Sequence, residues 1–225
     1  MADPIKITII LGLYFVINII SEYIYKRFNL RAESTRKIVH TSVGILTLLF
    51  PFIFDNYLPV AVICVIFLLV AWLSKIFNFL DSINDIFHKS YGSIMDPIIA
   101  FLLFLGYDFV GTICCDTPQY ILYVLPMLTA AFADPIAATI GRRYPIKKTI
   151  HSKSLGGFLS FIITAFFISI LCFLIFIPTM SNSEMVMVGF GIAVAGGVAE
   201  SLTKQGWDNF AIPTATFVMT YFMLY

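Results

Sequence analysis

Apolar residues occur along this chain in long blocks, and charged residues gather in the short segments between the blocks. A transmembrane helix needs about 20 mostly apolar residues to cross roughly 30 Å of hydrocarbon. The pattern therefore predicts an all-α fold, a polytopic transmembrane helical bundle of about eight spans. The predicted spans are 5–24, 38–54, 58–74, 94–111, 120–140, 155–178, 185–200 and 210–225. Because three of these blocks are short, seven and nine spans remain open.

Composition supports a membrane protein. Of the 225 residues, 60% are hydrophobic and 12% are charged, against about 25% charged residues in an average soluble domain. We find no internal repeat or flexible linker, so residues 1–225 are expected to form a single domain. The first apolar block lacks a basic segment before it and a small-residue cleavage pattern after it, which favours a retained helix over a signal peptide.

Basic residues are distributed unevenly between the loops. Thirteen of the fourteen Lys and Arg residues lie in the alternate loops 25–37, 75–93, 141–154 and 201–209. Because Lys and Arg accumulate in cytoplasmic loops, we expect the N-terminus outside and any site built from these loops to face the cytoplasm. The same charges could instead only set the topology and contact anionic lipid, above all in loop 25–37. We expect no nucleic-acid partner, and the oligomeric state remains open.

One stretch, "DPIAATIGRRYPIKKTIHSKSLGG", runs from Asp134 to Gly157. Asp134 is predicted just inside the cytoplasmic end of the fifth span, where Pro135 removes a helix hydrogen bond. An acid at such a depth in a membrane usually has a function, although a purely structural ion pair is the alternative.

The loop that follows Asp134 is rich in groups that bind phosphate. Arginine forks, lysine ammonium groups, hydroxyls and backbone amides freed by glycine can together hold a polyphosphate. The candidates are Gly141, Arg142, Arg143, Lys147, Lys148, Ser152, Lys153, Ser154 and Gly156. A Walker P-loop is excluded, because the position that requires a second glycine holds Ile146 and a membrane helix precedes the loop.

Two other stretches lie at the same predicted membrane face. In "STRKIVHTSVG", from Ser34, the side chains of Arg36, Lys37 and His40 follow at helical spacing. In the fourth span, Asp96 either adds a carboxylate to this region or lies at the interface; the sequence does not decide between these roles.

In "AESLTKQGWDNFAIP", from Ala199 to Pro213, Glu200 ends one span and Asp208-Asn209 opens the next. A carboxylate beside a carboxamide can coordinate Mg²⁺, although Asp-Asn is also a good helix N-cap. Acids for a metal beside cations for phosphate are typical of phosphoryl transfer, and the bilayer indicates a lipid as acceptor.

Together the three stretches resemble the family of dolichol kinase, phytol kinase and CTP-dependent diacylglycerol kinase, with phytol kinase most similar. The resemblance rests on Arg36-Lys37-x-x-His40, on Asp134 through Gly141-Arg142-Arg143 to Lys153-Ser154-x-Gly156, and on Glu200 followed by Asp208-Asn209-x-x-x-Pro213. The chain departs from the family pattern at Ala133, Pro145, Gly157 and Trp207.

The resemblance implies a membrane enzyme that phosphorylates a lipid alcohol with CTP and Mg²⁺. The loop from Arg142 to Gly156 would hold the CTP phosphates, and Asp134, Asp208 and Asn209 would hold the metal. Either Asp208 or Glu200 would take the hydroxyl proton. Arg36, Lys37 and His40 would neutralise the phosphate in transfer, so the implied catalytic set is Asp208, Glu200, Asp134 and His40.

Two other functions remain possible on the sequence. A CTP-dependent phosphatidate cytidylyltransferase would use the same nucleotide at the same face and would release pyrophosphate. A small transporter would use Asp134 and Asp96 as coupling sites, but transporters usually show repeated halves and midplane sites.

Overall fold

The computed structural model describes residues 3–30, 32–77, 80, 91–113, 120–146, 153–204 and 206–225, and every element in these ranges is helical. The helices are α1 Asp3–Phe28, α2 Ala32–Thr47, α3 Phe50–Ile53, α4 Tyr57–Phe77, α6 Gly92–Ile113, α7 Tyr120–Leu128, the π-helical turn η1 Thr129–Ala133, α8 Asp134–Arg143, α9 Leu155–Phe176, α10 Asn182–Leu202 and α11 Asp208–Leu224. The predicted all-α bundle is confirmed.

Seven helical stretches of the described chain are long and apolar enough to cross a membrane. They match the first seven predicted spans; α2 with α3 forms the second, and α7, η1 and α8 together form the fifth. The eighth predicted span, 210–225, corresponds to α11, which has 17 residues. At 1.5 Å per residue this helix is about 26 Å long, slightly less than a bilayer core of about 30 Å.

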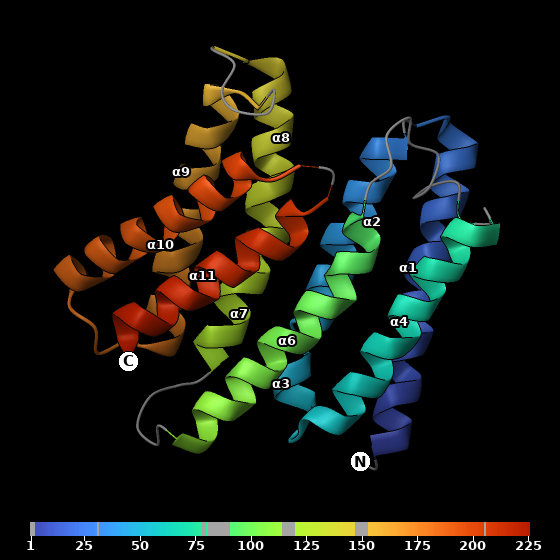
Figure 1. The fold of residues 1–225 in the computed structure, drawn as a ribbon, viewed down its shortest axis with the longest axis horizontal. Coiled ribbons are helices and arrows are strands. Elements are labelled where there is room, and N and C mark those ends of the chain that lie inside the picture. Colours follow the sequence, from blue (N-terminus) through green and yellow to red (C-terminus); the bar gives the residue numbers. More distant parts are fainter. Residues whose placement is uncertain are drawn as a thin grey trace.

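The helices form two groups that are joined by α11 and by direct contacts of α2 and α6 with the fifth span (Figure 1). The first group contains α1, α2, α4 and α6, and the second contains α7 to α10; α11 packs on α10, α7 and α6. Large aromatic side chains fill the first group, including Phe67 and Phe104, whereas alanines allow close packing in the second group around Phe161. Large apolar side chains such as Phe167 and Phe222 remain exposed on the outside, as lipid contact requires.

The fifth span is interrupted just before Asp134. The π-helical turn η1 ends at Ala133, and Pro135 has no amide hydrogen to donate to the carbonyls four and five residues earlier. Those two carbonyls accept hydrogen bonds from α2 instead: His40 Nε2 donates to Ala130 O at 3.2 Å, and Thr41 Oγ1 donates to Ala131 O at 2.9 Å. The proline thus fixes the position of α2 against the turn that carries Asp134.

Candidate functional site

A cavity of about 390 Å³ lies where the ends of five helices meet. Its polar lining comes from the start of α2, from α8, from the segment before α9, from the end of α10 and from the start of α11. Nine of the predicted site residues line it: Arg36, Lys37, Asp134, Gly141, Arg142, Lys153, Ser154, Glu200 and Asp208. The three stretches that the sequence singled out therefore converge on one cavity, although they are far apart along the chain.

Lys153 connects two acids across this cavity. Its Nζ lies 2.7 Å from Glu200 Oε1 and 3.6 Å from Asp208 Oδ2, and it also donates to the Glu200 carbonyl. The Glu200 side chain is only 8% exposed and the Lys153 side chain 22%. A buried carboxylate is unfavourable without a partner, so this lysine compensates the charge that α10 and α11 bring together.

Asp134 is the first residue of α8 and is buried, with 8% of its surface exposed. The charges that act on it most strongly include those of Asp208, Lys37 and Lys153. Two carboxylates therefore face one cavity with cations around them, an arrangement suited to a polyphosphate with its metal ion.

The turn between α8 and α9 is held close to the helices. Ser154 caps α9 by accepting from the Gly157 amide at 3.1 Å, and its hydroxyl donates to the Gly141 carbonyl at 3.0 Å. A Cβ on Gly156 would lie 2.1 Å from the Tyr144 carbonyl oxygen. Only glycine allows this approach of the backbone, which explains the glycine in the motif.

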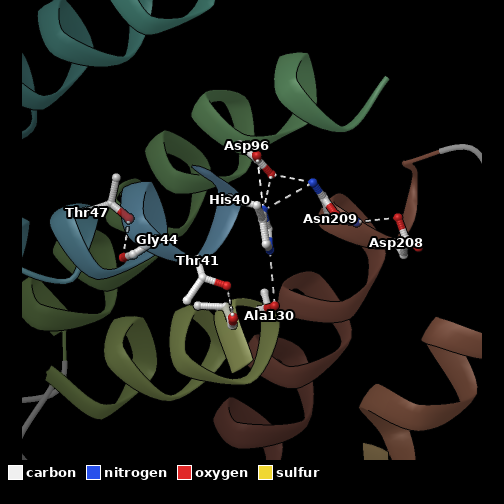
Figure 2. A network of polar contacts seen from close by, with 9 residues as sticks. His40, Thr41, Gly44, Thr47, Asp96, Ala130, Asp208 and Asn209 are labelled. Carbon is white, nitrogen blue, oxygen red and sulfur yellow. Dashed lines mark hydrogen bonds and ion pairs between the residues drawn. The ribbon is translucent and has the colours of Figure 1, made fainter. Parts of the chain in front are cut away.

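A second polar cluster lies beside the first cavity and contains His40, Asp96 and Asn209 (Figure 2). His40 Nδ1 lies 3.1 and 3.2 Å from the two Asp96 carboxylate oxygens, and Asn209 Nδ2 donates to Asp96 Oδ1 at 2.7 Å. His40 Nδ1 also lies 3.3 Å from Asn209 Nδ2, and His40 Nε2 donates to the Ala130 carbonyl, which only accepts. Asp96 is thus held from two sides.

The remaining predicted residues are distributed as follows. His40 and Asn209 line smaller cavities and not the large one. Arg143 lies at the end of α8 with its guanidinium 5.6 Å from the centre of the Tyr144 ring. Lys147, Lys148 and Ser152 lie outside the described residues.

The predicted metal site has two of its three residues in the large cavity, Asp134 and Asp208. Within the described part of the chain, no group of three or more His, Cys, Asp and Glu side chains is arranged to hold a metal ion. Mg²⁺ typically takes only one or two carboxylates and completes its shell with phosphate oxygens and water. The two aspartates therefore fit a magnesium ion that arrives with a nucleotide.

Asp96 was left undecided by the sequence, and its place in the cluster is the main addition from the structure. The signal in the sequence was an Asp-Pro dipeptide at the edge of a span, which is compatible with both a site and an interface.

Comparison with known proteins gives a match to a curated phytol kinase. No family model matches the chain, and no solved structure matches it. A phytol kinase from Synechocystis sp. is 27% identical over 186 residues, which cover 81% of this chain and 76% of that protein. The alignment spans most of both chains, so the protein described here is a distant relative of a phytol kinase.

Proposed function

We propose that this protein is a lipid-alcohol kinase that transfers the γ-phosphate of CTP to the hydroxyl of a membrane lipid at the cytoplasmic face. The acceptor would be an isoprenoid alcohol such as phytol, farnesol or a polyprenol, or else diacylglycerol. The observation that carries the proposal is the cavity where cations and carboxylates from five helix ends meet beside apolar helices. The similarity to a phytol kinase supports the class of reaction, and the motif resemblance supports CTP as donor.

In the proposed reaction, the basic residues would bind phosphate and the acidic residues would bind the metal ion. Arg36, Lys37 and Arg142 would contact phosphate oxygens, since they line the cavity and carry donors that match them. Asp134 and Asp208 would hold Mg²⁺, which would neutralise charge on the β- and γ-phosphates. Lys153 would keep Glu200 and Asp208 compatible with burial in the absence of substrate.

The test is transfer of label from γ-labelled CTP to lipid. Purified protein in lipid nanodiscs is incubated with Mg²⁺ and, separately, phytol, farnesol, a polyprenol and diacylglycerol, and the organic phase is counted. We expect label in at least one alcohol, CDP as the second product, and loss of transfer on chelation of Mg²⁺. Parallel reactions with labelled ATP, GTP and UTP test the choice of nucleotide.

A matched pair of variants ties the activity to this cavity. Asp134→Asn should lower the transfer rate by about 10² or more, because it removes a carboxylate from the charged centre of the site. Asp108→Asn, an equivalent change at the far end of α6, should leave the rate within about twofold, because surface changes away from a site have small effects. Absence of label in every alcohol, with pyrophosphate released from CTP and phosphatidate, would instead establish a cytidylyltransferase.

A further inference from the structure

Two small cavities lie on either side of the cluster of His40, Asp96 and Asn209, apart from the large cavity. Their volumes are about 40 and 20 Å³. Both are lined by the three cluster residues together with Val43, Phe67 and Pro97. Both are lined by α2, α4, α6 and α11, to which α1 adds in the larger cavity and α7 and η1 add in the smaller one. The walls are mainly apolar, so each cavity is an apolar space with one polar cluster in its wall.

A buried acceptor adds to the polar end of the larger of these cavities. Asn18 is 4% exposed and lines the wall, with its Nδ2 donating to the Tyr14 carbonyl at 2.8 Å. Its Oδ1 is buried and accepts no hydrogen bond from the described residues. Buried polar atoms are normally hydrogen-bonded, so Asn18 carries an unused acceptor in the wall of this cavity.

Shared or neighbouring residues line the small cavities and the large one at two places. Arg36 lines both the large cavity and the 40 Å³ cavity. At the start of α11, Asp208 lines the large cavity and its neighbour Asn209 lines the two small ones. Gly92 lies close to both Arg36 and Asn209, since a Cβ on this glycine would be 2.8 Å from Arg36 Nη1 and 2.8 Å from Asn209 Nδ2. The wall between the 40 Å³ cavity and the large one therefore includes Arg36, which could contact groups on both sides.

We propose that the small cavities bind the hydroxyl end of the acceptor alcohol and that Asp96 takes its proton. This inference rests on the proposed function. In the step, the alcohol oxygen forms a bond to the γ-phosphorus, and the bond from that phosphorus to the β,γ-bridging oxygen breaks. The bonding electron pair stays on the nucleoside diphosphate, and the hydroxyl proton moves to the Asp96 carboxylate. His40 and Asn209 are positioning residues that aim this carboxylate.

The alternative bases are less suitably placed. Glu200 and Asp208 pair with Lys153 and line the large cavity. Asp96 is also paired, with His40, but it lines the small, mainly apolar cavities that an alcohol would enter. The volumes suit only the first atoms of the alcohol, so the rest of its chain would lie along the apolar outside of the helices.

Two variant pairs test the proposal once the wild-type protein transfers phosphate to an alcohol. Val43 lines both small cavities, so Val43→Phe would put a larger side chain into their walls, and Val65→Phe makes the same change at an exposed position of α4. We expect Val43→Phe to raise KM for the alcohol about tenfold, because the larger side chain would occupy the space proposed for the hydroxyl end of the alcohol. Its KM for CTP and all constants of Val65→Phe should stay within about twofold.

Asp96→Asn tests the proton acceptor, with Asp108→Asn on the same helix as its control. We expect kcat to fall by about 10² to 10⁴ for Asp96→Asn, the usual contribution of a general base. Equilibrium binding of labelled CTP should be unchanged, which separates a catalytic role from a folding defect.

The outcomes separate this inference from the proposed function. Transfer by the wild type together with normal kinetics of Val43→Phe and Asp96→Asn would overturn the acceptor site and leave the kinase intact. Absence of transfer to any alcohol by the wild type would overturn both. A photoreactive alcohol tests binding directly. Labelling of α2 and α4 peptides in the wild type, but not in Val43→Phe, would support the acceptor site by a measurement that does not depend on phosphate transfer.

Discussion

Lys153 is predicted to stabilise the protein by neutralising two acids, independently of any contact with a nucleotide. The perturbation is Lys153→Met, which keeps the length and most of the volume of the side chain but removes the ammonium group. Glu200 would then lose the partner that lies 2.7 Å from its Oε1, and Asp208 the one at 3.6 Å from its Oδ2. Lys204→Met, a change at an exposed position in the same region, is the control.

The expected size follows from burial. Breaking a buried ion pair by removing one partner costs about 3 to 5 kcal/mol. The Glu200 side chain is 8% exposed but that of Lys153 is 22% exposed, so the lower end, about 3 kcal/mol, applies. For a chain of this length such a loss lowers Tm by about 6–12 °C. Lys204→Met should change Tm by less than about 2 °C.

The assay is thermal unfolding in a fixed detergent, followed by tryptophan fluorescence and repeated for a double-mutant cycle. In the Lys153→Met background, Glu200→Gln removes the orphaned charge and should recover about 2 kcal/mol. In the otherwise wild-type protein, the same Glu200→Gln change should destabilise, because the lysine then loses its closest carboxylate. Additive effects of the two changes would refute the pairing, and a drop in Tm equal to that of Lys204→Met would refute its energetic importance.

Two further predictions concern the backbone around the site. Gly156→Ala should lower the free energy of unfolding by about 1–3 kcal/mol, because its Cβ would meet a backbone carbonyl at 2.1 Å. Gly12→Ala, where a Cβ meets nothing within 4 Å, should be neutral or stabilising by up to about 1 kcal/mol in the same melts. Thr41→Val should cost about 1–2 kcal/mol, since it removes the donor to the Ala131 carbonyl. In a Pro135→Ala background this cost should fall below about 0.5 kcal/mol, because the restored amide can take over that carbonyl; an equal cost in both backgrounds would contradict the role of the proline.

Much of the fold follows from the sequence, because a span leaves a strong local signal. The long apolar blocks and the alternation of basic loops predicted the membrane helices and placed their charged ends at one face. The main difference concerns α11, whose 17 residues are fewer than the about 20 that a span needs. The polar first turn of α11 belongs to the candidate site. Packing of α11 against α6 and α10 stabilises this helix, although it is short for a membrane span.

The sequence predicted which residues belong to the candidate site better than it predicted how their side chains are arranged. Asp208 and Asn209 read as one metal-binding pair in the sequence, yet they line different cavities. The reason is elementary: successive residues of an α-helix point about 100° apart, so neighbours at the first turn of α11 diverge. The role of Asp96 was equally hidden, since its partners His40 and Asn209 are 56 and 113 residues away and no local pattern connects them.

The divergence of Asp208 and Asn209 has a consequence for the proposed reaction. The phosphate side is built largely from α8, the start of α9 and the end of α10, whereas the apolar side is built from α1, α4 and α6. Arg36 and the first turn of α11 belong to both sides, so the transferred group would pass where the two sets of helices meet. Under the proposed function, changes in α1 or α4 would alter the choice of alcohol without moving the residues proposed to hold the nucleotide.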